Sequence, residues 1–69
     1  MEKQTLKVEG MSCEHCVKAV NNALNAITGV ADINVSLQDG MVSFSHDSAL
    51  APLETIKAAI TEEGFVVAG

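Results

Sequence analysis

Polar and apolar residues alternate at the start of the chain, which predicts a half-buried β-strand over residues 3–9 that ends at Gly10. From about Cys16 the apolar spacing changes to three and four residues, which is typical of one face of an amphipathic helix. This face consists of Val17, Val20, Leu24 and Ile27. We expect Thr28 and Gly29 to close the helix, with Gly29 in the left-handed position that follows a helix end.

The second half of the chain shows the same order of patterns. Alternation returns in two runs, whose inward positions are Ile33, Val35, Leu37, Val42 and Phe44. Asp39 followed by Gly40 separates the runs and is a strong signal for the turn of a β-hairpin. We therefore predict two strands joined by a hairpin, with His46 at the end of the second one as a residue that covers the edge of the core.

A second apolar face of helical spacing follows the hairpin. It consists of Leu53, Ile56 and Ile60. We expect Pro52 in the first turn of this helix, where its missing N–H leaves no hydrogen bond unmade. Glu63 and Gly64 should end the helix, and residues 65–67 should form a final short strand.

The predicted order is strand, helix, strand, strand, helix, strand, in which two strand–helix–strand units are joined by the hairpin. Right-handed crossovers then give an α+β, ferredoxin-like βαββαβ fold, a four-stranded antiparallel sheet with both helices on one face. The length of 69 residues, without a linker or a low-complexity stretch, predicts a single domain over residues 1–69.

The composition limits both the core and the partners. The chain has two Phe and no Trp or Tyr, so its core must be largely aliphatic. Nine acidic residues against four lysines give a net charge of −5, which argues against nucleic-acid binding because such binding needs clustered Lys and Arg.

No stretch approaches the roughly 18 apolar residues of a membrane span, and the polar N-terminus lacks the apolar segment of a secretory signal. We therefore expect a cytoplasmic protein with reduced cysteines.

Both cysteines of the chain, Cys13 and Cys16, fall between the first strand and the first helix. We expect Cys16 in the first helical turn, where unpaired N–H groups and the helix dipole favour a thiolate. Two converging thiolates form a soft site of low coordination number that suits Cu(I). Zinc prefers four ligands, or three and a water, so it remains an alternative only with an added Asp or Glu ligand.

A C-x-x-C pair at a helix start also occurs in thioredoxin-type oxidoreductases, so dithiol redox chemistry is a second candidate. The short chain, the residues Glu14 and His15 between the cysteines, and the position of Pro52 away from the thiols weigh against it. A cysteine pair without a function is the third alternative.

Three further residues are expected to influence the thiols. Met11, at the base of the loop, is interpreted as an adaptable core filler that positions the loop rather than as a thioether ligand. His15 is expected to point to solvent and to be a bystander or a tuning residue rather than a ligand. Phe65 precedes the last strand, at the end of the sheet where the cysteine loop lies, and is expected to form a hydrophobic wall beside the thiolates.

The loop from Gly10 to Cys16 reads G-M-S-C-E-H-C and resembles the G-M-[ST]-C-x-x-C signature of heavy-metal-associated domains. The length and the element order of the whole chain are also similar to that family, and a C-x-H-C loop is typical of its bacterial copper chaperones. At the position of Phe65 these members usually carry tyrosine, so a hydroxyl that can form a hydrogen bond near the sulfurs is missing here.

The resemblance implies a cytoplasmic Cu(I) carrier, not an enzyme, whose metal ligands are Cys13 and Cys16. It implies transfer of copper by ligand exchange to the metal-binding domains of a copper-transporting P-type ATPase. A further implied partner is a copper-responsive repressor. Because an ion held by two thiolates is under-coordinated, we also expect that two copies of the chain can share it through bridging thiolates in a metal-bridged homodimer. The alternatives are a carrier for mercury or zinc and a metal-binding domain of a heavy-metal ATPase.

Overall fold

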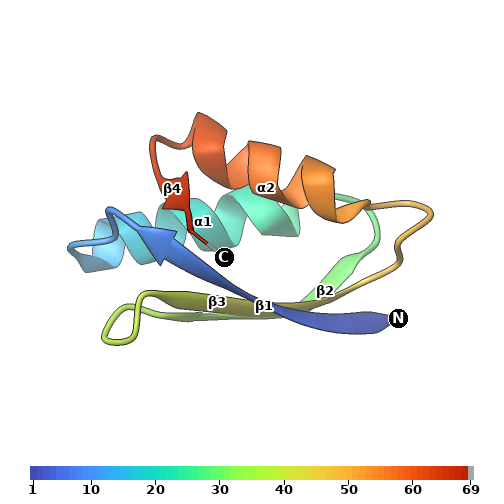
Figure 1. Cartoon of the computed structure of the whole chain (residues 1–69), viewed down its shortest axis with the longest axis horizontal. Helices are drawn as coiled ribbons and strands as arrows, with labels where there is room; N and C mark the ends of the chain where they lie inside the picture. Colours follow the sequence, from blue (N-terminus) through green and yellow to red (C-terminus); the bar gives the residue numbers. More distant parts are fainter. Residues whose placement is uncertain (69) are drawn as a thin grey trace.

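Strands and helices follow one another in the predicted order in the computed structural model, which describes residues 1–68. The elements are β1 (Glu2–Glu9), α1 (Glu14–Asn25), β2 (Val30–Ser36), β3 (Met41–His46), α2 (Leu53–Glu62) and β4 (Val66–Val67). Both helices lie on one side of the sheet (Figure 1), so the predicted α+β, ferredoxin-like architecture is confirmed. Within the described residues, neither helix is long and apolar enough to cross a lipid bilayer.

β1 and β3 form the centre of the sheet, whose strand order is β2-β3-β1-β4 and whose pairs are all antiparallel. The pairing of β1 with β3 begins with Glu2 opposite His46. β4 has two residues and pairs with the last part of β1, where Val67 lies opposite Val8. This short pairing brings the segment before β4 to the end of β1, where the cysteine loop begins.

The core lies between the sheet and the two helices and is largely aliphatic, as the composition predicted. α1 contributes Val20 and Leu24, and α2 contributes Ile56 and Ile60, which are all fully buried. The other buried apolar residues are Leu6, Val8, Val42, Phe44, Ala51 and Phe65. The apolar faces predicted from helical and strand periodicity are thus confirmed at their centres.

α1 begins and ends earlier than its apolar pattern indicated. It runs from Glu14 to Asn25, with Ala26 as the C-cap. Ile27 lies beyond the helix but packs against the core, which explains why its spacing extended the helical pattern. The prediction that Gly29 follows the helix end directly is wrong, because Gly29 lies in the turn that leads into β2, with φ of +98°.

β2 departs from the regular alternation that its sequence predicted. Its pairing with β3 shifts in register between Ala31 and Asn34, and Asp32 between them has φ of +53°. Such a shift is typical of a β-bulge, which bends a strand and redirects its side chains. Leu37 was expected in the strand but lies in the hairpin turn. Gly40 ends this turn, as predicted, and has φ of +66°.

The ends of β3 and α2 fix the remaining boundaries. His46, the last residue of β3, is 2% exposed, and its Nδ1 lies 2.8 Å from the carbonyl oxygen of Ala51, so its predicted place at the core edge is confirmed. Pro52 is the N-cap of α2, one position before the predicted first turn, because its ψ of 150° is extended. Glu63 is the C-cap, and Gly64, with φ of +95°, ends α2 as expected.

Candidate metal centre

Two apolar side chains contact the loop between β1 and α1. Met11 is half-buried and packs against the core. Gly10 has φ of +101°, and a Cβ at this position would lie 3.4 Å from Cδ1 of Phe65. Phe65 itself is 8% exposed. The structure therefore packs Met11 of the loop against the core and places Phe65 beside Gly10, while their influence on a metal stays a prediction.

The main chain of Cys13 starts α1. Its φ of −158° and ψ of 171° are extended, and it is the N-cap of the helix. Its carbonyl oxygen accepts hydrogen bonds from the N–H groups of Cys16 at 3.0 Å and Val17 at 3.3 Å. The Cys13 side chain makes no capping hydrogen bond. The helix start therefore uses the Cys13 carbonyl and leaves its thiol free for another role.

The two thiols lie close together at the surface. Their Sγ atoms are 3.7 Å apart, well beyond the roughly 2.05 Å of a disulfide bond, and both cysteines are free. Cys13 is exposed, and Cys16, in the first turn of α1 as expected, is half-buried. The pair is thus accessible to an ion or to the thiol of another protein.

The start of α1 lowers the pKa of the Cys16 thiol from its ordinary value. The main cause is a hydrogen bond with the backbone of Ser12, and the hydrogen bond with the Cys13 side chain comes next; partial burial acts in the opposite direction. Sequence reasoning predicted the direction from the helix start but overlooked Ser12. The available signal was its position directly before the first cysteine, where backbone N–H groups lack helical partners.

The structure does not bring a third predicted donor to the sulfurs. The His15 side chain is exposed. His46 lies at the other end of the sheet, since it pairs with Glu2 at the start of β1. Within residues 1–68, no group of three or more His, Cys, Asp or Glu side chains is placed to hold a metal ion. The candidate centre therefore consists of the two sulfur atoms.

Two sulfur donors at an exposed helix start have a definite chemical capacity. Thiolates are soft ligands and select thiophilic ions such as Cu(I) over hard cations. A pair of thiolates leaves the remaining coordination positions of an ion open to an incoming ligand. The geometry therefore suits reversible metal holding better than a closed structural site, which needs about four ligands for zinc.

Comparisons with known proteins agree with this geometry. Residues 5–65 match the family model described as "Heavy-metal-associated domain". Over 68 residues, the chain is 44% identical to the copper chaperone CopZ of Bacillus subtilis (strain 168), with 99% of each chain covered.

Solved structures show the same fold. A structure described as "CopZ metallochaperone" superposes with a TM-score of 0.93 at 42% identity, covering 97% of this chain and 100% of that chain. The N-terminal domain of a potential copper-translocating P-type ATPase from Bacillus subtilis, solved in the Cu(I)-loaded state, gives a TM-score of 0.91 at 29% identity, covering 96% of this chain and 82% of that one. The chain therefore belongs to the heavy-metal-associated domain family.

Proposed function

We propose that the protein is a copper chaperone that binds Cu(I) through the Sγ atoms of Cys13 and Cys16. The observation that carries this proposal is the pair of free thiols, 3.7 Å apart at the exposed start of α1. The choice of copper is supported by the relative of 44% identity, which is a copper chaperone. The choice of the Cu(I) state is supported by the preference of soft sulfur ligands and by the Cu(I)-loaded ATPase domain of the same fold.

The proposed mechanism is ligand exchange. An ion held by two thiolates is under-coordinated, so a cysteine of an acceptor protein adds to it as a third ligand. One thiolate of the donor then leaves, and the ion passes across without being released to solvent. The lowered pKa of Cys16 favours the thiolate form that acts as the ligand. No covalent bond of a substrate is made or broken, so the protein acts as a carrier rather than as an enzyme.

The proposed acceptors are the metal-binding domains of a copper-transporting P-type ATPase. The support is that the N-terminal domain of a potential copper-translocating P-type ATPase, solved in the Cu(I)-loaded state, shares this fold with a TM-score of 0.91. We propose the reducing cytoplasm as the location, because free thiols at this distance require protection from oxidation. The copper-responsive repressor stays a prediction of the family resemblance, and the metal-bridged homodimer stays a prediction from the open coordination of a two-thiolate site.

Competition titrations separate copper from the other candidates. Cu(I), Zn(II) and Hg(II) are each titrated into the reduced protein against a chelator of known affinity, with Cys13→Ser as the variant. We expect tight Cu(I) binding at one ion per chain and its loss in the variant. Weak Cu(I) binding that is unchanged in Cys13→Ser contradicts the proposal, and binding of Zn(II) that is tighter than that of Cu(I) indicates a zinc carrier instead.

The dithiol oxidoreductase is tested separately. A dithiol potential near the roughly −270 mV of thioredoxin, together with catalysed reduction of a disulfide substrate, favours that function. We expect no catalysis above that of a small dithiol at equal concentration.

A further inference from the structure

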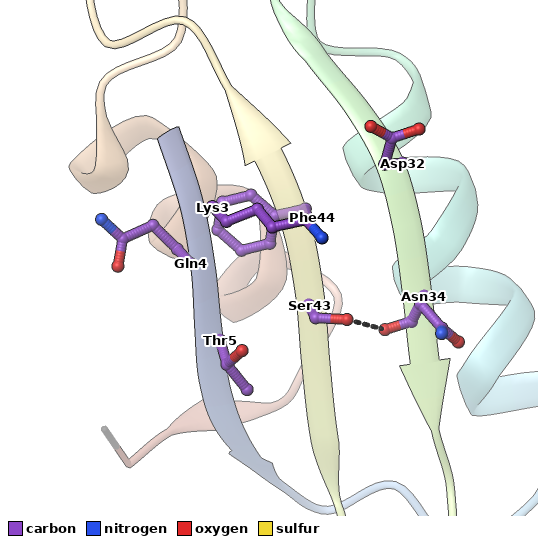
Figure 2. Close-up of a pocket in the computed structure, with 7 residues that line it drawn as sticks. All are labelled: Lys3, Gln4, Thr5, Asp32, Asn34, Ser43 and Phe44. Atoms are coloured by element: carbon purple, nitrogen blue, oxygen red, sulfur yellow. Dashed lines mark hydrogen bonds between the residues drawn. The ribbon is translucent and has the colours of Figure 1, made fainter. Parts of the chain in front are cut away.

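A polar depression lies on the face of the sheet that the helices leave open. Its volume is about 290 Å³, and Figure 2 shows it with the helices behind the sheet. The lining residues are Lys3, Gln4 and Thr5 of β1, Asp32 and Asn34 of β2, and Ser43 and Phe44 of β3. None of them belongs to the thiol loop, so the depression is separate from the candidate metal centre.

The strand register explains why the sheet is hollow at this point. Ser43 in β3 lies directly between Thr5 of β1 and Asn34 of β2. All three side chains are short, and they lie on the face opposite to the buried Val42 and Phe44, because neighbouring residues of a strand point to opposite faces. A row of short polar side chains across three strands therefore forms the floor of the depression.

A carboxylate of β2 also borders the depression. Asp32 lines it together with Asn34, two residues further along the strand, where regular alternation places both side chains on one face. Asp32 is the one non-glycine residue with positive φ among the described residues, at +53°, and it falls between the two residues where the pairing with β3 changes register.

A lysine ammonium borders the same depression. Figure 2 shows the Lys3 side chain reaching from β1 across β3 in the direction of β2. Among the side chains of the seven residues drawn, the one hydrogen bond joins the Ser43 hydroxyl, as donor, to the main-chain oxygen of Asn34 at 3.4 Å. Lys3 and Asp32 therefore present opposite charges to the depression without a hydrogen bond to each other.

We propose that this depression binds a small zwitterion, a molecule with a carboxylate and an ammonium group and the size of a free α-amino acid. Lys3 donates to the carboxylate, Asp32 accepts from the ammonium group, and the Thr5 hydroxyl and the Asn34 amide supply further polar contacts. A lone anion would be repelled by Asp32 and a lone cation by Lys3, so only the zwitterion matches both charges. The volume of about 290 Å³ lies just below the roughly 300–1,000 Å³ of typical small-ligand sites, which suits a ligand as small as a free amino acid.

Backbone amide shifts, followed by NMR in the reduced, metal-free protein, test this proposal. The probes are free L-alanine as the zwitterion, acetate as the anion and ethylammonium as the cation. We expect saturable shifts with L-alanine at the amides of Thr5, Asp32 and Ser43, and no saturable shifts with either of the other probes.

The variants Lys3→Met and Asp32→Asn remove one charge each. Asparagine tolerates the left-handed conformation, so Asp32→Asn keeps the bulge. Each variant should weaken L-alanine binding at least tenfold. Lys7→Met is the matched control, since Lys7 lies four residues along the same strand and outside the lining, and it should leave binding unchanged.

Three results would overturn the proposal: absence of saturation with L-alanine, equal binding of acetate or ethylammonium, or unchanged binding in Lys3→Met. The site does not depend on the proposed copper function, because it shares no residue with the thiol pair. Each variant should keep the Cu(I) stoichiometry of the parent protein, so a failure of this proposal and a failure of the copper proposal are distinguishable.

Discussion

Cys13 has two roles that belong to different parts of the residue. Its carbonyl oxygen accepts the first hydrogen bonds of α1, while its thiol makes no capping bond and stays exposed. A substitution at the side chain should therefore remove a metal ligand without removing the helix start. This separation makes position 13 suitable for testing function independently of folding.

We predict that Cys13→Ser abolishes tight Cu(I) binding and still folds. Serine is a preferred N-cap residue, whereas alanine is a poor one, so Cys13→Ser should be more stable than Cys13→Ala by about 1 kcal/mol. Urea unfolding of both metal-free variants measures the difference. Loss of the folded state in both variants would show that the thiol is structural and would contradict the carrier proposal.

The lowered pKa of Cys16 predicts a pH dependence of its reactivity. A thiol with a lowered pKa keeps its thiolate form to lower pH. The rate of alkylation at Cys16 should therefore decrease only when the pH falls through this lowered pKa. By linkage, ionisation of Cys16 adds stability above the pKa of the unfolded chain, and this gain is lost as the pH falls through the folded-state pKa.

Alkylation rates at Cys16, mapped by mass spectrometry across pH, measure this shift. The same protein in urea is the reference, with an expected midpoint near the ordinary value of about 8.5. A midpoint in the folded protein at or above that of the unfolded chain would contradict the role of the helix start.

The candidate site could be predicted in its ligands but not in its surroundings. The sequence is sufficient to identify Cys13 and Cys16 because both cysteines fall at the change from strand to helix periodicity. The contribution of Ser12 depends on the direction of a backbone group, so its position directly before the first cysteine is the only sign of it in the sequence. The approach of Phe65 to Gly10 was anticipated only through the predicted topology, because the two residues lie at opposite ends of the chain.

At the scale of elements, the turn between α1 and β2 packs tightly against the loop that joins β3 to α2. Gly29 in this turn has φ of +98°, and a Cβ there would lie 2.8 Å from Cβ of Leu50. Gly64 after α2 has a similar φ of +95° but no atom within 4 Å of such a Cβ. The two glycines therefore share a backbone requirement and differ in packing.

We predict that Gly29→Ala destabilises the protein more than Gly64→Ala. Both variants carry the cost of a left-handed alanine, about 1–2 kcal/mol. Gly29→Ala adds the cost of moving Cβ of Leu50 out of the way, typically about 1–3 kcal/mol for a steric conflict of this kind. Urea denaturation of the two metal-free variants measures their free energies of unfolding. Equal decreases in the two variants would show that the turn accommodates the added Cβ without a loss of stability.

The buried faces of the helices could be predicted from apolar periodicity. Features that depend on a single backbone angle could not. The faces of α1 and α2 follow from apolar spacing and are confirmed by the burial of Leu24 and Ile60. The end of α1 was misjudged because Ile27 continues the helical spacing although it reaches the core from a turn. The β2 bulge at Asp32 leaves little trace in the alternation, since it depends on a positive φ that aspartate adopts only occasionally.

At the scale of the whole molecule, the fold separates the thiol pair from most of the core. Cys13 is exposed, and of the two cysteines only Cys16 packs partly against core residues. The packing between the sheet and the helices therefore rests on apolar core residues rather than on the Cys13 thiol. Metal binding should add to the stability of an already folded chain rather than create the fold.

We predict that Cu(I) raises the free energy of unfolding in proportion to its affinity. At a free Cu(I) concentration of 100 times the dissociation constant, the gain is about 2.7 kcal/mol. Anaerobic urea unfolding in a Cu(I) buffer measures the gain, with the double variant Cys13→Ser, Cys16→Ala as the control that should show none. If the metal-free protein is unfolded, the chain needs the metal to fold, and the prediction that metal binds to an already folded chain is wrong.

The most direct test of the account is the transfer of Cu(I) itself. The loaded protein is mixed anaerobically with a metal-binding domain of a copper-transporting P-type ATPase in the presence of excess chelator. We expect copper to reach the domain at a rate that rises with the domain's concentration and exceeds the rate of loss to the chelator. A transfer rate that equals the loss to the chelator, and does not change with the concentration of the domain, would show release to solvent and contradict direct exchange between thiolates.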